Sequence, residues 1–356
     1  MKTKFWQVSA VYPDFNIIKQ AATIIREGGL VAFPTETVYG LGADGLNPEA
    51  VKNIFVAKGR PNDNPLILHI AEGRDILCLA RQADSDPRVP QLISRFWPGP
   101  LTLVLAKQKI IPDEVTAGLD TVAIRMPQHP VALALIRESG VPLAAPSANR
   151  SGYPSPTTGQ HVYTDLGGRI EAILESGPTG VGVESTILDL SGDVPVILRP
   201  GGVTKEALVA VLGPVYLDPG LSDPRQIPKA PGMKYKHYSP RAEVLLVQGA
   251  RVKVAAKIKE LTFQYSAQGK KVGLLLSTET WAELGAETER LPAFYRCNLG
   301  STFQLEEIAR IIYSELRNCD LQGVEIILTE AYQIEGIGAA LMNRLLKSAG
   351  QRVIKV

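Results

Sequence analysis

Cysteine and histidine are scarce in this sequence, and the few residues of each kind are scattered. Its 356 residues include three cysteines, Cys78, Cys297 and Cys319, and four histidines. An odd number of widely separated cysteines argues against a disulfide framework and against a CxxC metal site. The histidines form neither an HExxH motif nor a paired-histidine zinc pattern. We therefore expect no metal ligands from the protein and a reducing compartment, the cytoplasm.

Strong net charge and long apolar runs are also missing. The formal net charge is +2, so no global electrostatic field favours nucleic acid or a membrane surface. No apolar run reaches the 18 residues that a membrane-spanning helix needs, and we expect no membrane association. The opening stretch MKTKFWQVSAVYPDF has no apolar core of the kind found in signal peptides.

The two commonest nucleotide-binding signatures are absent as well. No GxxxxGK[ST] occurs, so a bound ATP would not be held by a Walker loop. No GxGxxG follows a predicted strand, so nothing supports a dinucleotide site. Any nucleotide chemistry must therefore rest on other groups.

The length of the chain predicts two domains. We expect a catalytic domain over residues 1–212, a proline-rich linker over 213–241, and a smaller domain over 242–356. The linker contains six prolines, and long stretches without periodicity often act as lids. Residues 218–241 carry five basic and two acidic side chains, a balance of +3. A solvated linker and an anion-binding segment both fit that balance.

Short apolar runs alternate with amphipathic stretches, which is typical of α/β domains. In the first domain we predict strands at 29–33, 66–70, 101–106, 122–125, 143–145 and 186–190. Helices are predicted over 47–58, behind an Asn-Pro start, and over 130–139. In the second domain we predict strands at 244–247, 271–276 and 324–328 and helices at 252–261, 303–316 and 338–347. Their alternation favours a parallel, Rossmann-like sheet.

Three motifs place polar groups where a strand or helix ends. In FPTETVYGLG, over residues 33–42, the hydroxyls of Thr35 and Thr37 could hold a small polar substrate, or they could cap a helix. In KGRPNDN, over residues 58–64, Lys58 and Arg60 could bind a triphosphate, or they could interact with the dipole at the C-terminal end of a helix. In PSANRSGYPS, over residues 146–155, small polar side chains surround Gly152, which fits a close ligand or an ordinary turn.

Three further motifs follow along the chain. Ser185 and Thr186 open a strand in ESTI, and Arg199 begins RPG at the end of the same region. The linker contains KYKHYSP, over residues 234–240, whose two lysines, one histidine and two tyrosines are unusual for a spacer.

In this order, PTETVYGLG, KGRP with DNPL, SAN with SG, ESTI, RPG and KHYSP resemble the motifs of the YrdC-like threonylcarbamoyl-AMP synthases in their long, two-domain form. The stretch GIGAALMNRLLKSA also resembles that family's second domain, so the resemblance covers nearly the whole chain. It implies an open, twisted α/β sheet domain with a large, positively charged cavity, followed by a smaller Rossmann-like α/β domain. It also implies an enzyme, a nucleotidyltransferase that uses Mg²⁺ and makes threonylcarbamoyl-AMP and pyrophosphate from L-threonine, bicarbonate and ATP. The product would serve the threonylcarbamoyladenosine modification of tRNA beside the anticodon.

The resemblance also implies roles for individual residues. Lys58 and Arg60 would be catalytic, with Lys58 facing the phosphates. The L-threonine side would comprise Thr37, His69, Arg125, Ala145 and Ser185. The ATP side would comprise Arg60, Asn64, Thr121, Ser147, Asn149, Ser155, Arg199, His237 and Tyr238. Which of His237 and Tyr238 makes the main linker contact stays open.

The expected chemistry agrees with these assignments. A carbamate is unstable in water, so its site should close, and the linker is expected to cover it. Transfer to the α-phosphorus needs positioning and neutralised charge more than a covalent nucleophile. Arg125 could pair with the carboxylate of threonine through two hydrogen bonds.

Other functions remain as alternatives. The basic linker is compatible with an RNA-binding module, although no Lys/Arg-rich recognition helix or aromatic RNA-binding stripe is present, so tRNA binding would be secondary. A carbamoyl-transfer enzyme of hydrogenase maturation would need zinc-finger and acylphosphatase segments, which this chain lacks. A nucleotide-binding regulatory domain would not need the full motif set. Brief contact with other proteins of tRNA threonylcarbamoylation is a further expectation.

Overall fold

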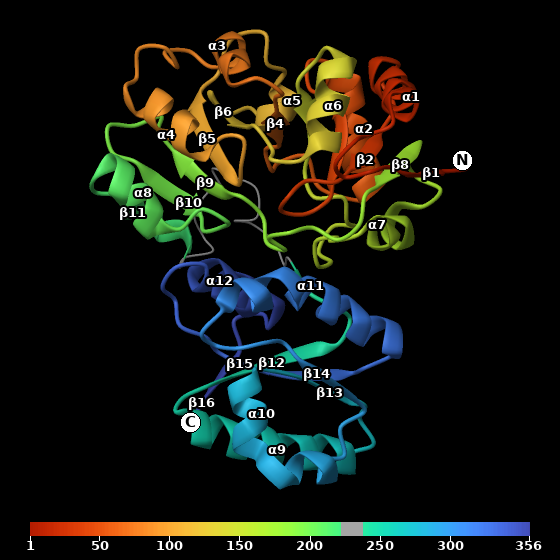
Figure 1. Ribbon diagram of the computed structural model, residues 1–356, viewed down its shortest axis with the longest axis vertical. Coiled ribbons are helices and arrows are strands. Elements are labelled where there is room, and N and C mark those ends of the chain that lie inside the picture. The colour runs from red at the N-terminus through yellow and green to blue at the C-terminus, as the bar shows by residue number, and fades with distance from the viewer. Residues whose placement is uncertain (222–237) are drawn as a thin grey trace. The chain divides into compact units, whose positions relative to one another are not determined.

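The structure, a computed structural model, describes residues 1–221 and 238–356. These residues form two compact units (Figure 1). The first contains residues 1–151 and 155–221, and the second contains residues 152–154 and 238–356. His237 of the KYKHYSP motif lies outside the described residues. Among the helices of the described part, none is long and apolar enough to cross a membrane.

The first unit is built on one sheet of eleven strands. In spatial order the strands are β1 (Lys4–Gln7), β8 (Ala172–Glu175), β2 (Val31–Phe33), β3 (Gly40–Asp44), β7 (Leu143–Ala144), β4 (Ile67–His69), β6 (Thr121–Arg125), β5 (Leu101–Ala106), β9 (Thr186–Asp189), β10 (Val196–Arg199) and β11 (Tyr216–Leu217). Parallel and antiparallel pairs are mixed: β4 runs parallel to β6, whereas β5 runs antiparallel to it. The predicted α/β sheet domain is confirmed, with more strands than the sequence patterns indicated.

Helices connect these strands where local end signals permit. They are α1 (Phe15–Arg26), α2 (Pro48–Lys58), α3 (Ile76–Leu79), α4 (Arg88–Phe96), α5 (Asp113–Thr116), α6 (Pro130–Ser139), α7 (Gly159–Leu166) and α8 (Lys205–Leu212), with 3₁₀ turns η1 (Gly73–Asp75) and η2 (Pro219–Leu221). At the start of α2 the Asn47 side chain accepts hydrogen bonds from the backbone N–H groups of Glu49 and Ala50. Gly59 ends that helix in the left-handed conformation, with φ of 61°. The predicted helices over 47–58 and 130–139 are therefore confirmed.

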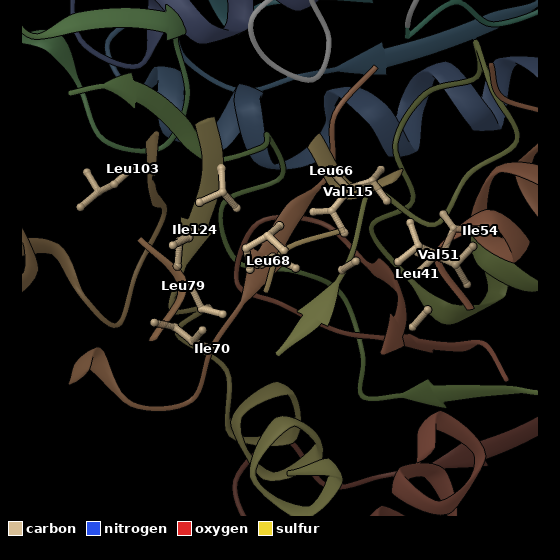
Figure 2. Close-up of a cluster of buried hydrophobic side chains, with 14 of the residues drawn as sticks. Leu41, Val51, Ile54, Leu66, Leu68, Ile70, Leu79, Leu103, Val115 and Ile124 are labelled. Atoms are coloured by element: carbon tan, nitrogen blue, oxygen red, sulfur yellow. The ribbon is translucent and has the colours of Figure 1, made fainter. Parts of the chain in front are cut away.

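Alternation along the central strands gives the sheet an apolar core on each face. Along β2, Val31 and Phe33 join the core that α1 and α6 cover, whereas Ala32 points to the other core. Figure 2 shows part of that second core, which includes Leu41, Leu68 and Ile124 of the sheet and Val51 and Ile54 of α2, with Leu41 beside the two α2 residues. The sheet is therefore buried on both sides, and polar groups near its strand ends stand on a rigid support.

The second unit is a five-stranded parallel sheet in the order β14 (Tyr295–Asn298), β13 (Val272–Leu276), β15 (Ile326–Glu330), β12 (Glu243–Gln248) and β16 (Val353–Lys355). Within this unit, α9 (Arg251–Ala267) and α10 (Thr278–Leu284) pack together on one face, and α11 (Leu305–Gln322) and α12 (Gly338–Ser348) pack on the other (Figure 1). The 3₁₀ turn η3 (Gly285–Arg290) follows α10. The predicted parallel, Rossmann-like arrangement is confirmed.

Candidate active site

The loop over residues 34–39 leaves β2 and brings Thr37 to the end of β6. Nη1 of Arg125 donates a hydrogen bond to Thr37 Oγ1 at 3.0 Å. Strands β2 and β6 are separated by β3, β7 and β4, a distance of about 19 Å at the usual strand spacing. The loop and the long Arg125 side chain together bridge this separation. No helix begins at the two threonines, so the alternative that they are helix caps is wrong.

Arg125 sits almost fully buried at the carboxyl end of β6, with 3% of its surface exposed. Its Nε donates to the Gly99 carbonyl at 3.2 Å, and its Nη2 forms a 2.6 Å ion pair with Glu36 Oε1. With the bond to Thr37, the described residues accept two of the five N–H bonds of the guanidinium, and Nη2 has an ion pair but no hydrogen-bond partner there. Each terminal nitrogen therefore keeps an N–H, which is the arrangement that binds a carboxylate through two bonds.

The two threonine hydroxyls of the loop form a chain with a defined direction. Thr35 Oγ1 donates to the Val38 carbonyl at 2.7 Å, which uses its single hydrogen. The 2.8 Å contact between the two hydroxyls must then be donated by Thr37. Because Thr37 also accepts from Arg125, it retains a single lone pair for a ligand. At this position the protein can accept a hydrogen bond from a substrate O–H or N–H, but it cannot donate one.

His69 is the last residue of β4 and stands beside Arg125 in the parallel β4–β6 register. Burial, together with the nearby positive charge of Arg125, lowers the pKa of His69 to about 3. The ring is therefore neutral at physiological pH. Nδ1 lies 3.2 Å from the Ile67 carbonyl, which can only accept, so the neutral tautomer with its hydrogen on Nδ1 satisfies this contact.

This neutral histidine makes stability depend on pH. An unfolded chain binds a proton at His69 below pH 6.5, whereas the folded chain resists it down to about pH 3. The free energy of unfolding should therefore fall by about 2 kcal/mol between pH 6.5 and pH 4.5 through this group. Urea denaturation of the native protein and of His69→Gln checks this, since the variant lacks the titration. Parallel pH profiles for the two proteins would rule the effect out.

Ser185, expected on the L-threonine side, and Arg199, expected on the ATP side, are in direct contact. Arg199 donates to the Ser185 carbonyl from Nε at 3.1 Å and from Nη2 at 3.0 Å, and to Ser185 Oγ at 3.2 Å. Ser185 Oγ also lies 2.7 Å from Thr102 Oγ1 at the start of β5. All three side chains are buried. The structure thus joins the two expected halves of the site at this point.

Lys58 holds the loop of the SAN motif against the end of α2. Its Nζ donates to the carbonyls of Ser147, at 2.5 Å, and Asn149, at 2.6 Å. In return, the Lys58 carbonyl accepts from the Ser151 N–H at 3.0 Å. Lys58 has only 3% of its surface exposed. Its ammonium group therefore shapes the loop as well as supplying positive charge.

The SAN loop is also tied to the loop of the PTET motif. The Ala148 N–H donates to the Tyr39 carbonyl at 2.8 Å, and the Leu41 N–H donates to the Pro146 carbonyl at 2.8 Å. Within the SAN motif, Ser147 Oγ donates to Asn149 Oδ1 at 2.5 Å. Backbone hydrogen bonds therefore hold two motifs that are far apart in sequence side by side.

The KGRPNDN loop contains polar groups directed inward. Arg60 Nη2 donates to the Asn64 carbonyl at 3.1 Å, which folds the loop around the guanidinium. The Asn64 side chain is 1% exposed, and neither atom of its amide has a hydrogen-bond partner in the described part of the chain. Buried amides are normally paired, so an unpaired one at this place favours a ligand or a bound water.

The remaining expected residues lie at differing distances from these groups. Ser155 is fully buried, and its Oγ donates to Glu184 Oε1 at 2.5 Å beside the ESTI motif. The Ala145 N–H donates to the Ile67 carbonyl at 2.9 Å, two residues before His69. Thr121 begins β6 and Arg125 ends it, so the structure places Thr121 about 13 Å along the strand from Arg125.

Tyr238 belongs to the second unit, where its ring is buried. The ring stacks on Tyr313 with centroids 5.5 Å apart and planes 25° apart, and the Arg344 guanidinium carbon lies 5.3 Å from its centroid. Ser348 Oγ donates to the Tyr238 carbonyl at 2.6 Å. The expected contact between Tyr238 and nucleotide remains a prediction.

Sequence inspection missed three residues that this site uses. Glu36 pairs with Arg125, Thr102 contacts Ser185, and Gly201 packs against the ESTI backbone. A Cβ placed on Gly201 would lie 2.3 Å from both the Ser185 carbonyl carbon and the Thr186 nitrogen. The RPG motif itself was the available signal for Gly201, and Glu36 stood inside a motif already singled out.

Comparison with known proteins accounts for both units. Residues 23–201 match the Sua5/YciO/YrdC family, described as "Telomere recombination", and residues 203–350 match the "Threonylcarbamoyl-AMP synthase, C-terminal domain". The threonylcarbamoyl-AMP synthase of Bacillus subtilis is 49% identical over the full length of both chains. That of Pyrococcus abyssi is 51% identical, covering 95% of this chain and 96% of its own.

A solved structure agrees with these sequence relatives. The crystal structure of Pyrococcus abyssi Sua5 complexed with L-threonine matches with a TM-score of 0.92 and 49% identity, covering 99% of this chain and all of the other. The order of the motifs, the two folds and relatives near 50% identity over the full length thus point to one conclusion: the chain belongs to the threonylcarbamoyl-AMP synthase family, in its two-domain Sua5 form.

Proposed function

We propose that this chain is an L-threonylcarbamoyladenylate synthase, which converts L-threonine, bicarbonate and ATP into threonylcarbamoyl-AMP and pyrophosphate. The observation that carries the proposal is Arg125, which is buried and keeps two N–H bonds for a carboxylate beside the neutral His69 and the acceptor Thr37. This combination suits the carboxylate, hydroxyl and amine of a small hydroxy amino acid. The relative of known structure binds L-threonine, according to its description.

The proposed reaction has two steps. The uncharged amine of threonine forms a C–N bond to carbon dioxide derived from bicarbonate, and it loses a proton to give a carbamate. A carbamate oxygen then forms a bond to the α-phosphorus of ATP, and the bond from that phosphorus to the bridging oxygen of pyrophosphate breaks. Burial and the charge of Arg125 keep His69 neutral, so it can offer a hydrogen bond to the anionic intermediate but no positive charge.

On the nucleotide side we propose Lys58, Arg60, Asn64, Ser147, Asn149, Ser155 and Arg199. Lys58, Arg60 and Arg199 supply positive charge for a triphosphate, and the first of these also fixes the SAN loop. Contacts of Thr121, His237 and Tyr238 with nucleotide are retained as predictions. In the described part of the chain, no three His, Cys, Asp or Glu side chains could hold a metal ion. Mg²⁺ is therefore proposed to enter with ATP and to neutralise phosphate charge there.

The wider setting is also a proposal. The product would be passed to the proteins that attach threonylcarbamoyl to the adenosine beside the anticodon of tRNA, with tRNA itself a secondary partner. The three cysteines are free thiols, which fits a reducing cytoplasm.

Pyrophosphate release from purified protein tests the activity. The assay contains ATP, Mg²⁺, bicarbonate and L-threonine, and each component is left out in turn. We expect release that needs both threonine and bicarbonate. Release that continues without threonine would contradict the proposed substrate.

A further inference from the structure

Glu36 makes contacts that its place beside the two threonines does not explain. Its side chain is largely buried, with 11% of its surface exposed, although it stands in a loop. Oε1 pairs with Arg125 Nη2 at 2.6 Å, and Oε2 accepts from the Gln128 N–H at 3.0 Å. Its carbonyl accepts from the Val181 N–H at 2.8 Å. One residue thus ties together the PTET loop, the end of β6 and the loop before Ser185.

Both partners of the Glu36 carboxylate are donors. Arg125 and the Gln128 backbone each present an N–H, and a carboxylate is the side-chain group that only accepts, with two oxygens for two donors. A glutamine of the same size has one accepting oxygen and one donating NH₂. In either orientation its NH₂ would face another N–H. A neutral side chain of the same shape therefore cannot accept from both Arg125 and the Gln128 backbone.

The pair with Glu36 also helps to hold the guanidinium of Arg125 for a ligand. Gly99 and Thr37 accept hydrogen bonds from Nε and Nη1, and Glu36 Oε1 forms an ion pair with Nη2 at 2.6 Å. These three contacts hold the guanidinium on both sides, so the N–H bonds that remain for a ligand have defined directions. Nη2 has no hydrogen-bond partner in the described part of the chain, so without Glu36 the plane of the group would be held on one side only.

We propose that Glu36 is a positioning residue that sets substrate choice, by holding Arg125 in the orientation that recognises the carboxylate of the amino-acid substrate. The inference rests on the proposed binding of threonine by Arg125. Glu36 itself does not contact the substrate. It affects how strongly the enzyme prefers a substrate with a carboxylate over the same amine without one.

The test compares kcat/KM for L-threonine with kcat/KM for 1-amino-2-propanol, which is threonine without its carboxylate. For Glu36→Gln we expect the ratio of the two values to fall by about 10-fold or more, as loss of a charge-assisted hydrogen bond implies. KM for ATP should stay unchanged. The ratio does not depend on the fraction of folded enzyme, so it remains informative if the variant is less stable. Glu36→Asp keeps the charge and both acceptors on a shorter stem, and it should give an intermediate ratio.

Two further variants make the outcome specific. Glu49→Gln removes a carboxylate from an exposed ion pair with Lys52 in the same unit and should leave the ratio unchanged. Arg125→Gln should lower the ratio as strongly as Glu36→Gln. An unchanged ratio in Arg125→Gln would overturn the proposed threonine site itself. A lowered ratio in Arg125→Gln with a native ratio in Glu36→Gln would overturn only the role of Glu36, as would equal losses for both substrates in Glu36→Gln.

Discussion

Replacing Lys58 by methionine is expected to lower turnover by roughly 10²-fold or more, the size typical of one preorganised electrostatic group. Methionine keeps the length of the side chain but removes the donors that bind the Ser147 and Asn149 carbonyls. Those two carbonyls would lose the ammonium group as a partner, and the SAN loop would keep only backbone contacts such as the Ser151 N–H to the carbonyl of residue 58. Pyrophosphate release under saturating L-threonine and varied ATP measures the effect, and KM for ATP should rise as well.

Lys52→Met on the same helix is the matched control. Lys52 is half exposed and pairs with Glu49 at 2.7 Å, so its loss should leave turnover unchanged. Native turnover in Lys58→Met would remove this lysine from the mechanism and from the shaping of the loop. A defect of equal size in both variants would point to the helix rather than to the ammonium group.

The second large effect is expected from a single methyl group at Gly201. A Cβ there would lie 2.3 Å from the Thr186 nitrogen and 2.4 Å from the Glu184 carbonyl oxygen, and both are backbone atoms that cannot turn aside. In Gly201→Ala the RPG and ESTI segments must move apart by about 1 Å, which displaces Ser185. A misplacement of that size can cost about 10²-fold in rate, and overpacking of this kind costs about 1–3 kcal/mol of stability.

Gly192→Ala provides the comparison, because a Cβ at Gly192 meets no described atom within 4 Å. Thermal unfolding and kcat/KM for L-threonine should match the native protein in Gly192→Ala and fall together in Gly201→Ala. If Gly201→Ala retains native kcat/KM, the close packing of RPG on ESTI does not position Ser185.

The ends of α2 were predicted well from the sequence because their signals are local, whereas α9 and α11 continue to Ala267 and Gln322, past the predicted ends at 261 and 316. Asn47 and Pro48 start α2 and Gly59 ends it, and each acts within a few residues of itself. Strand β3 was missed because its sequence GLGAD lacks the β-branched residues that mark strands. Its conformation depends on pairing with β2 and β7, which are distant in sequence or join it only after a loop.

The same contrast between local signals and contacts distant in sequence holds for the site. Motifs pointed to Thr37, Ser185 and Arg199, and the family resemblance added His69 and Arg125. The structure brings Thr37 into contact with Arg125, places His69 beside Arg125 and joins Ser185 to Arg199. The role of Glu36 could not be predicted, because its partner lies 89 positions later and no local pattern requires it. The carbonyl partners of Lys58 left no sequence signal either, since every residue type carries a carbonyl.

The sequence separations of these contacts constrain how the enzyme is made in the cell. Arg125 reaches back 88 residues to Thr37, Ser147 lies 89 residues after Lys58, and Ser185 lies 83 residues after Thr102. Strand β1 can form its pairs only after β8, which begins at Ala172, has been synthesised. A chain still emerging from the ribosome therefore has no complete binding site until Gly201 is clear of the exit tunnel, and β1 must stay unpaired for most of that time. Pauses in translation before this point would lengthen exposure to aggregation, whereas pauses after it would leave the first unit free to fold.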